Sequence, residues 1–466
     1  MQSFFLFTTR RIKLIAASFE NFGGKIMENA LNKMEALMTP IAMKLDQNKY
    51  LTAIKDGFFG VTSILIVGST FLLFSNLPIP NYPEFMAGIF GANWAEFFNV
   101  PYNMTMNLMN LYVIIGMARS LAKTYKVDDL GASITALVSF FILTPSVLDV
   151  NEASAIPMGS LGASGLFLGM ATAIISTEIY RYVIQKGWVI KFPDTVPSNV
   201  ALAFSALIPA LINILLFNLI RMGFAMTEYG HANEFIFNIL QQPLLALGGS
   251  LGANLLAILI AQLLWSFGIH GANIVNAIMT PIRLALTVDN ANAFQAGEEL
   301  PHIMTTQFIS YLPTMGGSGA TLGLTLLMLT VAKSKQFKTL GGLAIAPGFF
   351  NINEPIIFGI PIVLNPIMLI PFILVPLVST VLSYVVMNIG LVPFTNGVNL
   401  PWTTPAPIGM FIVSGWRGGV WSLILMVLQA GMYYPFFRVV DNNAYVLETE
   451  GEEGLEERAE LLEENA

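Results

Sequence analysis

Residues 340–365, LGGLAIAPGFFNINEPIIFGIPIVLN, are the most informative stretch for the fold of this chain. The stretch is apolar, but Pro347, Pro355 and Pro361 interrupt it, and Glu354 stands near its middle. Proline breaks a helix, and an ionisable residue at membrane depth is costly and usually functional. Non-helical backbone at that depth is tolerated only beside protein or a water-filled cavity. We therefore expect a re-entrant hairpin in a membrane protein, with a cavity around Glu354.

The composition of the whole chain agrees with a membrane protein. Of its 466 residues, 55% are hydrophobic and 11% are charged, whereas soluble domains carry roughly 25% charged residues. So little charge cannot cover a water-facing surface, which excludes a water-soluble enzyme. The absence of cysteine excludes disulfides, thiolate metal sites and a phosphocysteine on this chain. The sequence has no metal-ligand spacing and no basic, aromatic patch of the kind that binds nucleic acid.

Ten apolar runs can cross a bilayer, since about 20 residues span its hydrocarbon core. We predict an all-α, polytopic membrane protein with re-entrant hairpins and with crossings at 57–77, 103–122, 130–147, 162–184, 199–222, 248–268, 274–288, 311–332, 367–389 and 408–434. Two stretches, 38–56 and 232–247, are predicted to be amphipathic helices in the membrane interface, the first with lysines toward anionic lipid headgroups. An ordinary solvated segment is the alternative for 38–56.

The distribution of basic residues predicts the orientation, because Lys and Arg are retained on the cytoplasmic side. Basic clusters occur before residue 57, within 119–126, within 181–191 and within 333–338. An even number of crossings separates these clusters, so they share one side of the membrane. Parity then requires 340–365 to enter and leave on the same side, and we expect both termini in the cytoplasm.

Two groups of polar residues are candidates for binding a substrate. Glu354 lies close to Asn351 and Asn353 in the sequence. Such a carboxylate is a candidate base or hydrogen-bond acceptor for a substrate hydroxyl. The alternative is a glutamate that caps a broken helix. His270 lies between two glycines at a helix end, with Trp265 and Asn273 nearby in sequence. A structural histidine is the alternative there.

Other residues border these groups. Trp402, in NLPWTTPAPIGM, suits the C–H face of a sugar ring or, as the alternative, the interfacial aromatic belt. The stretch MGGSGATLG (315–323) contains Gly317 and Ser318, lacks the lysine of a nucleotide loop, and is predicted to allow a tight helix start beside a ligand. Arg283 and Arg417 pair with carboxylates or border the cavity; the sequence leaves both options open.

Five separated pieces of the sequence resemble enzyme IIC, the membrane component of the phosphoenolpyruvate-dependent sugar phosphotransferase system (PTS), in its lactose/cellobiose/N,N'-diacetylchitobiose family. They are NKYLTAIKDGF (48–58), SFGIHGANIVNAIMTP (266–281), TMGGSGATLGL (314–324), FFNINEPIIFGIPIVLNP (349–366) and NLPWTTPAPIGMFIVSGW (399–416). The resemblance covers roughly residues 27–440. It leaves out residues 1–26, predicted to be a leader or start-site extension, and residues 441–466, predicted to be an acidic cytoplasmic tail.

The resemblance implies a homodimer in the bacterial inner membrane. Each chain would comprise a cytoplasmic interfacial helix (27–56), a scaffold and dimerisation half (57–247), and a sugar-binding half (248–440) that moves like an elevator. A β-linked disaccharide such as diacetylchitobiose or cellobiose would be bound outside. A phosphocysteine on a separate IIB protein, charged by IIA, would phosphorylate its 6-hydroxyl. The chain would need no cofactor or metal and would not carry the phosphoryl donor itself.

The resemblance also implies roles for the candidate residues. Glu354, as the base, and His270 would contact the sugar hydroxyls near the phosphorylation position. Five further side chains would line the site, namely Trp265, Asn273, Asn351, Asn353 and Trp402. A competing interpretation is an ion-coupled sugar symporter in which Glu354 titrates in each cycle, because broken helices at the bilayer midplane are equally typical of such transporters.

Overall fold

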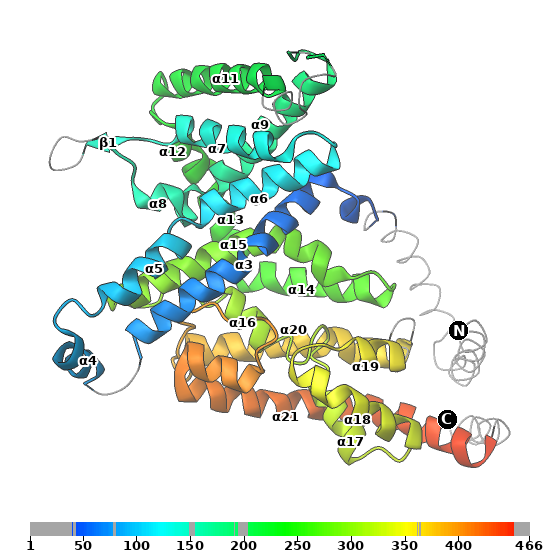
Figure 1. Cartoon of the computed structure of the whole chain (residues 1–466). Coiled ribbons are helices and arrows are strands. Elements are labelled where there is room, and N and C mark those ends of the chain that lie inside the picture. The colour runs from blue at the N-terminus through cyan, green and yellow to red at the C-terminus, as the bar shows by residue number, and fades with distance from the viewer. Residues whose placement is uncertain are drawn as a thin grey trace.

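The computed structural model describes residues 40, 43–77, 81–148, 154–190, 192–193, 204–360, 362 and 365–451. These residues are almost entirely helical, which confirms the all-α prediction (Figure 1). Within them, the strands β1 (Val147–Leu148) and β2 (Ser154–Ala155) form a small antiparallel pair. The predicted extension 1–26, Pro361 and most of the predicted tail lie outside the described residues.

The helices of the N-terminal half lie in the upper tier of Figure 1, except for Tyr82–Phe90, which lies at the level of the lower tier. They are α3 (Lys49–Ser75), α4 (Tyr82–Phe90), α5 (Glu96–Met106), α6 (Met109–Thr124), α7 (Asp129–Leu143), α8 (Met158–Leu161), the short 3₁₀ turn η2 (Ala163–Gly165), α9 (Leu166–Gln185) and α11 (Leu207–Ala225). Glycines let α3 and α6 approach closely, since a Cβ on Gly116 would lie 3.0 Å from the Cα of Gly57. Such small-residue contacts are typical of helices that pack within a membrane.

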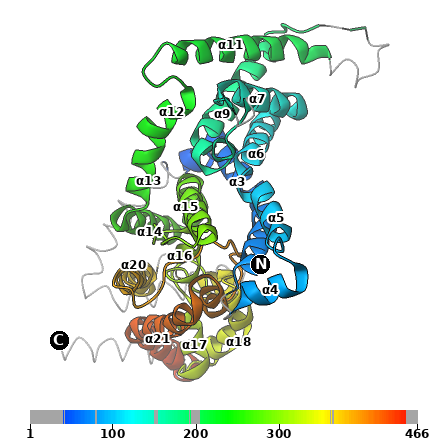
Figure 2. The same cartoon turned by 90° about the vertical axis from the view of Figure 1, so that its left-hand side faces the viewer.

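A broken helical segment connects the two halves. It consists of α12 (Ala232–Ile236), the π-helical turn η3 (Phe237–Gln241) and α13 (Gln242–Gly248), and it descends from the level of α11 to α14 (Leu251–Ser266) in Figure 2. The chain bends by 74° between α13 and α14. Asn254 holds this bend, because its Nδ2 donates to the Gly248 and Ser250 carbonyls at 2.7 and 2.9 Å. Helical structure at the predicted 232–247 is confirmed, and its place in the membrane interface stays a prediction.

From Thr306 onward the C-terminal half forms the lower tier of Figure 1, whereas its residues 271–296 lie beside α3. After α15 (Gly271–Ala296) it contains α16 (Thr306–Tyr311), α17 (Leu322–Thr330), α18 (Lys335–Phe349), α19 (Glu354–Gly359), α20 (Pro366–Asn388) and α21 (Ala406–Thr449), which kinks at Gly415. Apolar side chains of α17, α18, α19, α20 and α21 form one buried cluster. This cluster supports the loops that join α17, α18 and α19.

Some predicted boundaries are wrong. The run 311–332 is not one helix, because α16 ends at Tyr311 and α17 begins only at Leu322. The nine residues of α17 reach about 14 Å, less than the hydrocarbon core of about 30 Å. Gly316, Gly317 and Gly319 between them have φ values of 77°, 93° and 82°, which a helix cannot contain.

Three other boundaries also move. The predicted run 103–122 is divided between α5 and α6. Helix α15 extends well past the predicted 274–288 in spite of an internal proline. Helix α3 begins at Lys49, inside the predicted interfacial stretch 38–56. Among the described residues, six helices are long and apolar enough to cross a membrane, or seven if the bent pair is one span. Several other predicted crossings are shorter helices here, and the count of ten stays a prediction.

Candidate functional site

Asn351 joins three loops that are far apart in the sequence. Its Oδ1 accepts a hydrogen bond from the Gly316 N–H at 2.9 Å, and its Nδ2 donates to the carbonyls of Trp402 at 2.7 Å and Thr404 at 3.1 Å. The side chain is 7% exposed, and its φ of 63° lies in the left-handed region that Asn tolerates. One buried amide therefore fixes the loops 312–321, 350–353 and 399–405 against one another.

Asn353 makes a second tie between two of these loops. Its Nδ2 donates to the Ser318 carbonyl at 2.6 Å and to the Thr321 hydroxyl at 3.2 Å. Gly317 makes room for this amide, because a Cβ there would lie 2.5 Å from Asn353 Cγ. The predicted role of the glycine-rich stretch, a tight turn before a helix, agrees with this geometry.

Trp265, His270 and Asn273 form a second cluster where α14 gives way to α15. The rings of Trp265 and His270 lie 4.4 Å apart, and His270 Nδ1 accepts the Asn273 backbone N–H at 3.3 Å as the cap of α15. The ring packs on Trp265, and this burial lowers the pKa of His270, which lies outside the spanning helices. An acceptor at Nδ1 places the proton of the neutral ring on Nε2, which we infer from the hydrogen bond.

Glu354 and shared packing connect the loops tied by Asn351 and Asn353 to the cluster of Trp265, His270 and Asn273. Glu354 is the first residue of α19, its side chain is exposed, and it makes no hydrogen bond or ion pair with the described part of the chain. Its charge nevertheless acts on the His270 imidazole. Trp265 belongs to the buried cluster that holds Ile356 and Ile357, directly after Glu354. An exposed carboxylate therefore lies within electrostatic range of an imidazole whose Nε2 has no hydrogen-bond partner among the described residues.

The remaining predicted residues differ in which of their atoms are exposed and which are held by hydrogen bonds. Trp402 is 54% exposed, and its carbonyl is held by Asn351 while the indole is free to contact a ligand. The Asn273 side chain is exposed and has no hydrogen-bond partner among the described residues. Ser318 contributes its carbonyl to Asn353. No capping hydrogen bond is present at the start of α19, so the alternative that Glu354 caps a broken helix has no support.

Sequence reasoning missed some contributors and misjudged one. Thr321 and Thr404 join the hydrogen-bond ties described above, and only their place inside the glycine-rich and proline-rich motifs gave any signal. Arg283 was expected to pair with a carboxylate or border the cavity. It instead donates to Asn254 Oδ1 at 3.0 Å and to Asn276 Oδ1 at 3.3 Å, so the carboxylate pairing is wrong for the described residues. The buried amide of Asn254 and the exposed amide of Asn276 accept from this guanidinium beside the α13–α14 bend.

Two apolar cavities lie away from these residues. One of about 500 Å³ is lined by leucines and valines of α14 and α20, and another of about 390 Å³ lies between α9 and α11. Neither is lined by any of the candidate residues. The candidate residues lie instead on the loops 312–321, 350–353 and 399–405 and where α14 ends and α15 and α19 begin.

The chain thus combines long apolar helices, three loops tied by two buried asparagines, and an exposed carboxylate within electrostatic range of an imidazole. These are the features of a membrane transport protein with a polar ligand site. Comparison with known proteins makes the class specific: residues 55–376 match the family model described as "Phosphotransferase system, EIIC". The chain therefore belongs to the EIIC family of the phosphotransferase system, whose members are multi-pass membrane permeases for sugars.

Individual relatives resemble nearly the whole chain. The putative permease IIC component YwbA of Bacillus subtilis is 43% identical over 432 residues, covering 90% of this chain and 97% of the relative. The cellobiose-specific EIIC component of Geobacillus stearothermophilus is 43% identical over 428 residues, covering 89% and 95%. The crystal structure of ChbC, the IIC component of the N,N'-diacetylchitobiose-specific system, matches with a TM-score of 0.85 and 42% identity, covering 89% of this chain and 99% of ChbC.

Proposed function

We propose that this chain takes up a β-linked disaccharide of the diacetylchitobiose or cellobiose type while a separate IIB protein phosphorylates the sugar at its 6-hydroxyl. The sugars in the names of the cellobiose-specific relative and of ChbC support this substrate class. The observation that carries the proposal is the exposed Glu354 carboxylate, which has no partner in the described part of the chain and lies within electrostatic range of His270. It directly follows a loop that Asn351 and Asn353 hold in place.

Each group has a distinct task in the proposed reaction. The sugar 6-hydroxyl oxygen attacks the phosphorus of the IIB phosphocysteine, so an O–P bond forms, the S–P bond breaks and a thiolate leaves. Glu354 takes the proton of the hydroxyl as general base. His270 donates a hydrogen bond from Nε2 to a neighbouring sugar oxygen. Trp402 offers its free indole face to the sugar ring, and Trp265, Asn273, Gly317 and Ser318 line the remainder.

The proposal includes an assembly and a location. The chain would be a homodimer in the bacterial inner membrane with both termini in the cytoplasm, where IIB, charged by IIA, can reach the sugar. Basic residues at the ends of α6 and α9 support this orientation, since Lys and Arg remain on the cytoplasmic side. The half 57–247 would be the scaffold and the half 248–440 the part that moves like an elevator with the bound sugar. The 74° bend between α13 and α14 lies at the boundary of these halves.

Transport into sealed vesicles tests the proposal. Vesicles that contain the purified chain and enclose phosphorylated IIB should accumulate labelled cellobiose or diacetylchitobiose as the 6-phosphate, and a protonophore should leave the rate unchanged. Vesicles without IIB are the control and should accumulate no phosphorylated sugar. Accumulation of unmodified sugar that the protonophore abolishes would replace the proposal with an ion-coupled symporter.

A further inference from the structure

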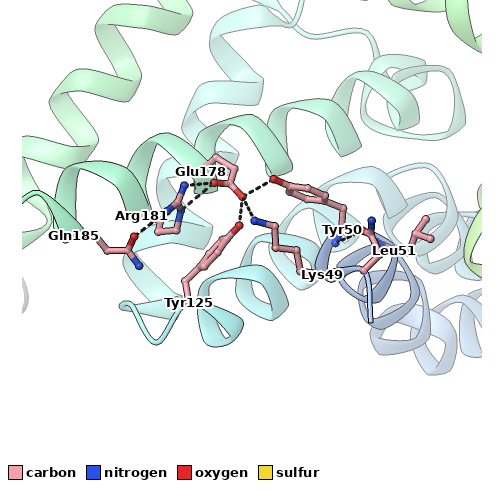
Figure 3. A network of polar contacts seen from close by, with 8 residues as sticks. Lys49, Tyr50, Leu51, Tyr125, Glu178, Arg181 and Gln185 are labelled. Carbon is pink, nitrogen blue, oxygen red and sulfur yellow. Dashed lines mark hydrogen bonds and ion pairs between the residues drawn. The ribbon is translucent and has the colours of Figure 1, made fainter. Parts of the chain in front are cut away.

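The first turn of α3 is fixed to the N-terminal half by the carboxylate of Glu178 on α9 (Figure 3). Lys49 Nζ lies 3.4 Å from Glu178 Oε1, and the Tyr50 hydroxyl donates to the same oxygen at 2.9 Å. Tyr125, at the end of α6, also donates to Oε1, and Arg181 donates to Oε2 at 2.7 and 2.9 Å. The network therefore holds the start of α3 against the ends of α6 and α9.

Lys55, further along α3, is a cation that this network does not use. It is exposed and makes no hydrogen bond or ion pair with the residues that the structure describes. The neighbouring carboxylate of Asp56 is directed toward α6, because the Ser120 hydroxyl donates to its Oδ2 at 2.7 Å. Of the three charged residues in NKYLTAIKDGF (48–58), Lys49 and Asp56 thus have partners in the described part of the chain and Lys55 has none.

The start of α3 lies beside the turn that carries His270. Leu45, just before α3, packs against Leu264 and Ile274, which are buried on either side of the turn between α14 and α15. Helices α3 and α15 also pack against each other. Burial is the main cause of the lowered pKa of His270, and the positive charge of Lys55 lowers that pKa further. The Lys55 ammonium is therefore within electrostatic range of the same imidazole as the Glu354 carboxylate.

The candidate site lacks a cation without Lys55. The Glu354 carboxylate is anionic, the lowered pKa of His270 favours its neutral form, and the other proposed site residues are uncharged. A transferring phosphoryl group carries negative charge on its three non-bridging oxygens, and its transfer depends chiefly on positioning and on groups that neutralise this charge. A lysine ammonium is a compact point charge with three donors that suits phosphate oxygens. Lys55 has the charge and the location that the reaction requires.

We propose that Lys55 is a catalytic residue that binds the transferring phosphoryl group, an inference that rests on the proposed phosphorylation of the sugar. Its ammonium donates hydrogen bonds to the non-bridging oxygens while the bond from the sugar 6-oxygen to phosphorus forms and the S–P bond breaks. Lys55 keeps its protons throughout, the proton of the hydroxyl goes to Glu354, and the thiolate leaves with IIB. Because the unmodified sugar has no phosphoryl oxygens, Lys55 acts on transfer and on the product but not on sugar binding.

Calorimetry of the purified full chain without IIB tests this division. Cellobiose and cellobiose 6-phosphate, or diacetylchitobiose and its 6-phosphate, are titrated into the parent and into Lys55→Gln. A hydrogen bond from a charged donor is worth about tenfold in affinity or more, so the variant should bind the 6-phosphate about tenfold more weakly and the unmodified sugar equally well. The matched control is Lys186→Gln, which removes the same charge from the exposed end of α9 and should leave both affinities unchanged.

Single-turnover transfer from phosphorylated IIB to saturating cellobiose or diacetylchitobiose completes the test. Lys55→Gln should lower the rate about a hundredfold, the usual effect of removing one group that stabilises transition-state charge. Lys55→Arg keeps the cation and should recover most of this loss, and all three variants should keep the melting temperature of the parent.

The outcomes separate this assignment from the proposed function. A parent that transfers the phosphoryl group, together with a Lys55→Gln variant of unchanged rate or unchanged 6-phosphate affinity, would overturn the role of Lys55 and leave the proposed function standing. Equal losses in the Lys55 and Lys186 variants would overturn it as well, because the effect would then follow net charge and not position. A parent that transfers no phosphoryl group to either sugar would overturn the proposed function and the assignment together.

Discussion

Asn351 offers the sharpest perturbation of the candidate site, because one buried side chain joins three loops with three hydrogen bonds. Each such bond contributes about 1 kcal/mol net, so we expect Asn351→Gly to destabilise the joined loops by about 3 kcal/mol. Alanine should cost about 1 kcal/mol more, since the φ of 63° at this position is left-handed and glycine adopts it without strain. The two variants thus separate the hydrogen bonds from the backbone strain.

Calorimetric titration of the purified chain with the disaccharide measures the effect. If sugar binding must supply the whole 3 kcal/mol to order the loops, the sugar affinity falls about 150-fold. We expect both variants to lose at least about tenfold, with alanine the weaker binder. Ile352→Ala is the matched control, because Ile352 is in the same loop, is 37% exposed and joins no other loop. Affinity of Asn351→Gly within about twofold of the parent would refute the reasoning.

Two further substitutions test other parts of the structure. Gly317→Ala places a Cβ 2.5 Å from Asn353 Cγ at a φ of 93° and should displace that amide and weaken sugar binding measured by calorimetry. Gly342→Ala is the control, because a Cβ there has nothing within 4 Å and should leave the affinity unchanged. Equal affinities of the two variants would contradict the role of Gly317. Asn254→Ala removes the two bonds that hold the α13–α14 bend and one partner of the buried Arg283, so it should destabilise the protein by about 3 kcal/mol or more. An unchanged melting temperature would show that the bend does not depend on this amide.

Much of the fold follows from hydropathy alone. The apolar runs near 57–77, 162–184, 367–389 and 408–434 all correspond to long helices in the structure, because about 20 apolar residues seldom have another stable arrangement in a membrane. Hydropathy does not register backbone conformation, however. The run 311–332 contains no charged residue, but its glycines at positive φ divide it into α16, a loop and α17.

The candidate site was predictable in its members but not in its connections. Proline and asparagine around Glu354 indicated an irregular, polar loop, and the structure has that loop between α18 and α19. That Asn351 binds Gly316 and Trp402, which are 35 and 51 residues away, depends on how three loops pack and leaves no periodic trace in the sequence. Arg283 shows the same limit, because the amide of Asn254 that receives it lies on a different helix.

The central claim is that Glu354 is the base that activates the sugar hydroxyl. Single-turnover transfer from phosphorylated IIB to a saturating disaccharide, measured for Glu354→Gln, tests it directly, because saturation removes any contribution from weaker binding. A positioned general base contributes about 10²–10⁴-fold to a rate, so we predict a loss of at least about a hundredfold. A glutamine variant that transfers the phosphoryl group at nearly the parent rate would show that Glu354 serves only to bind the sugar.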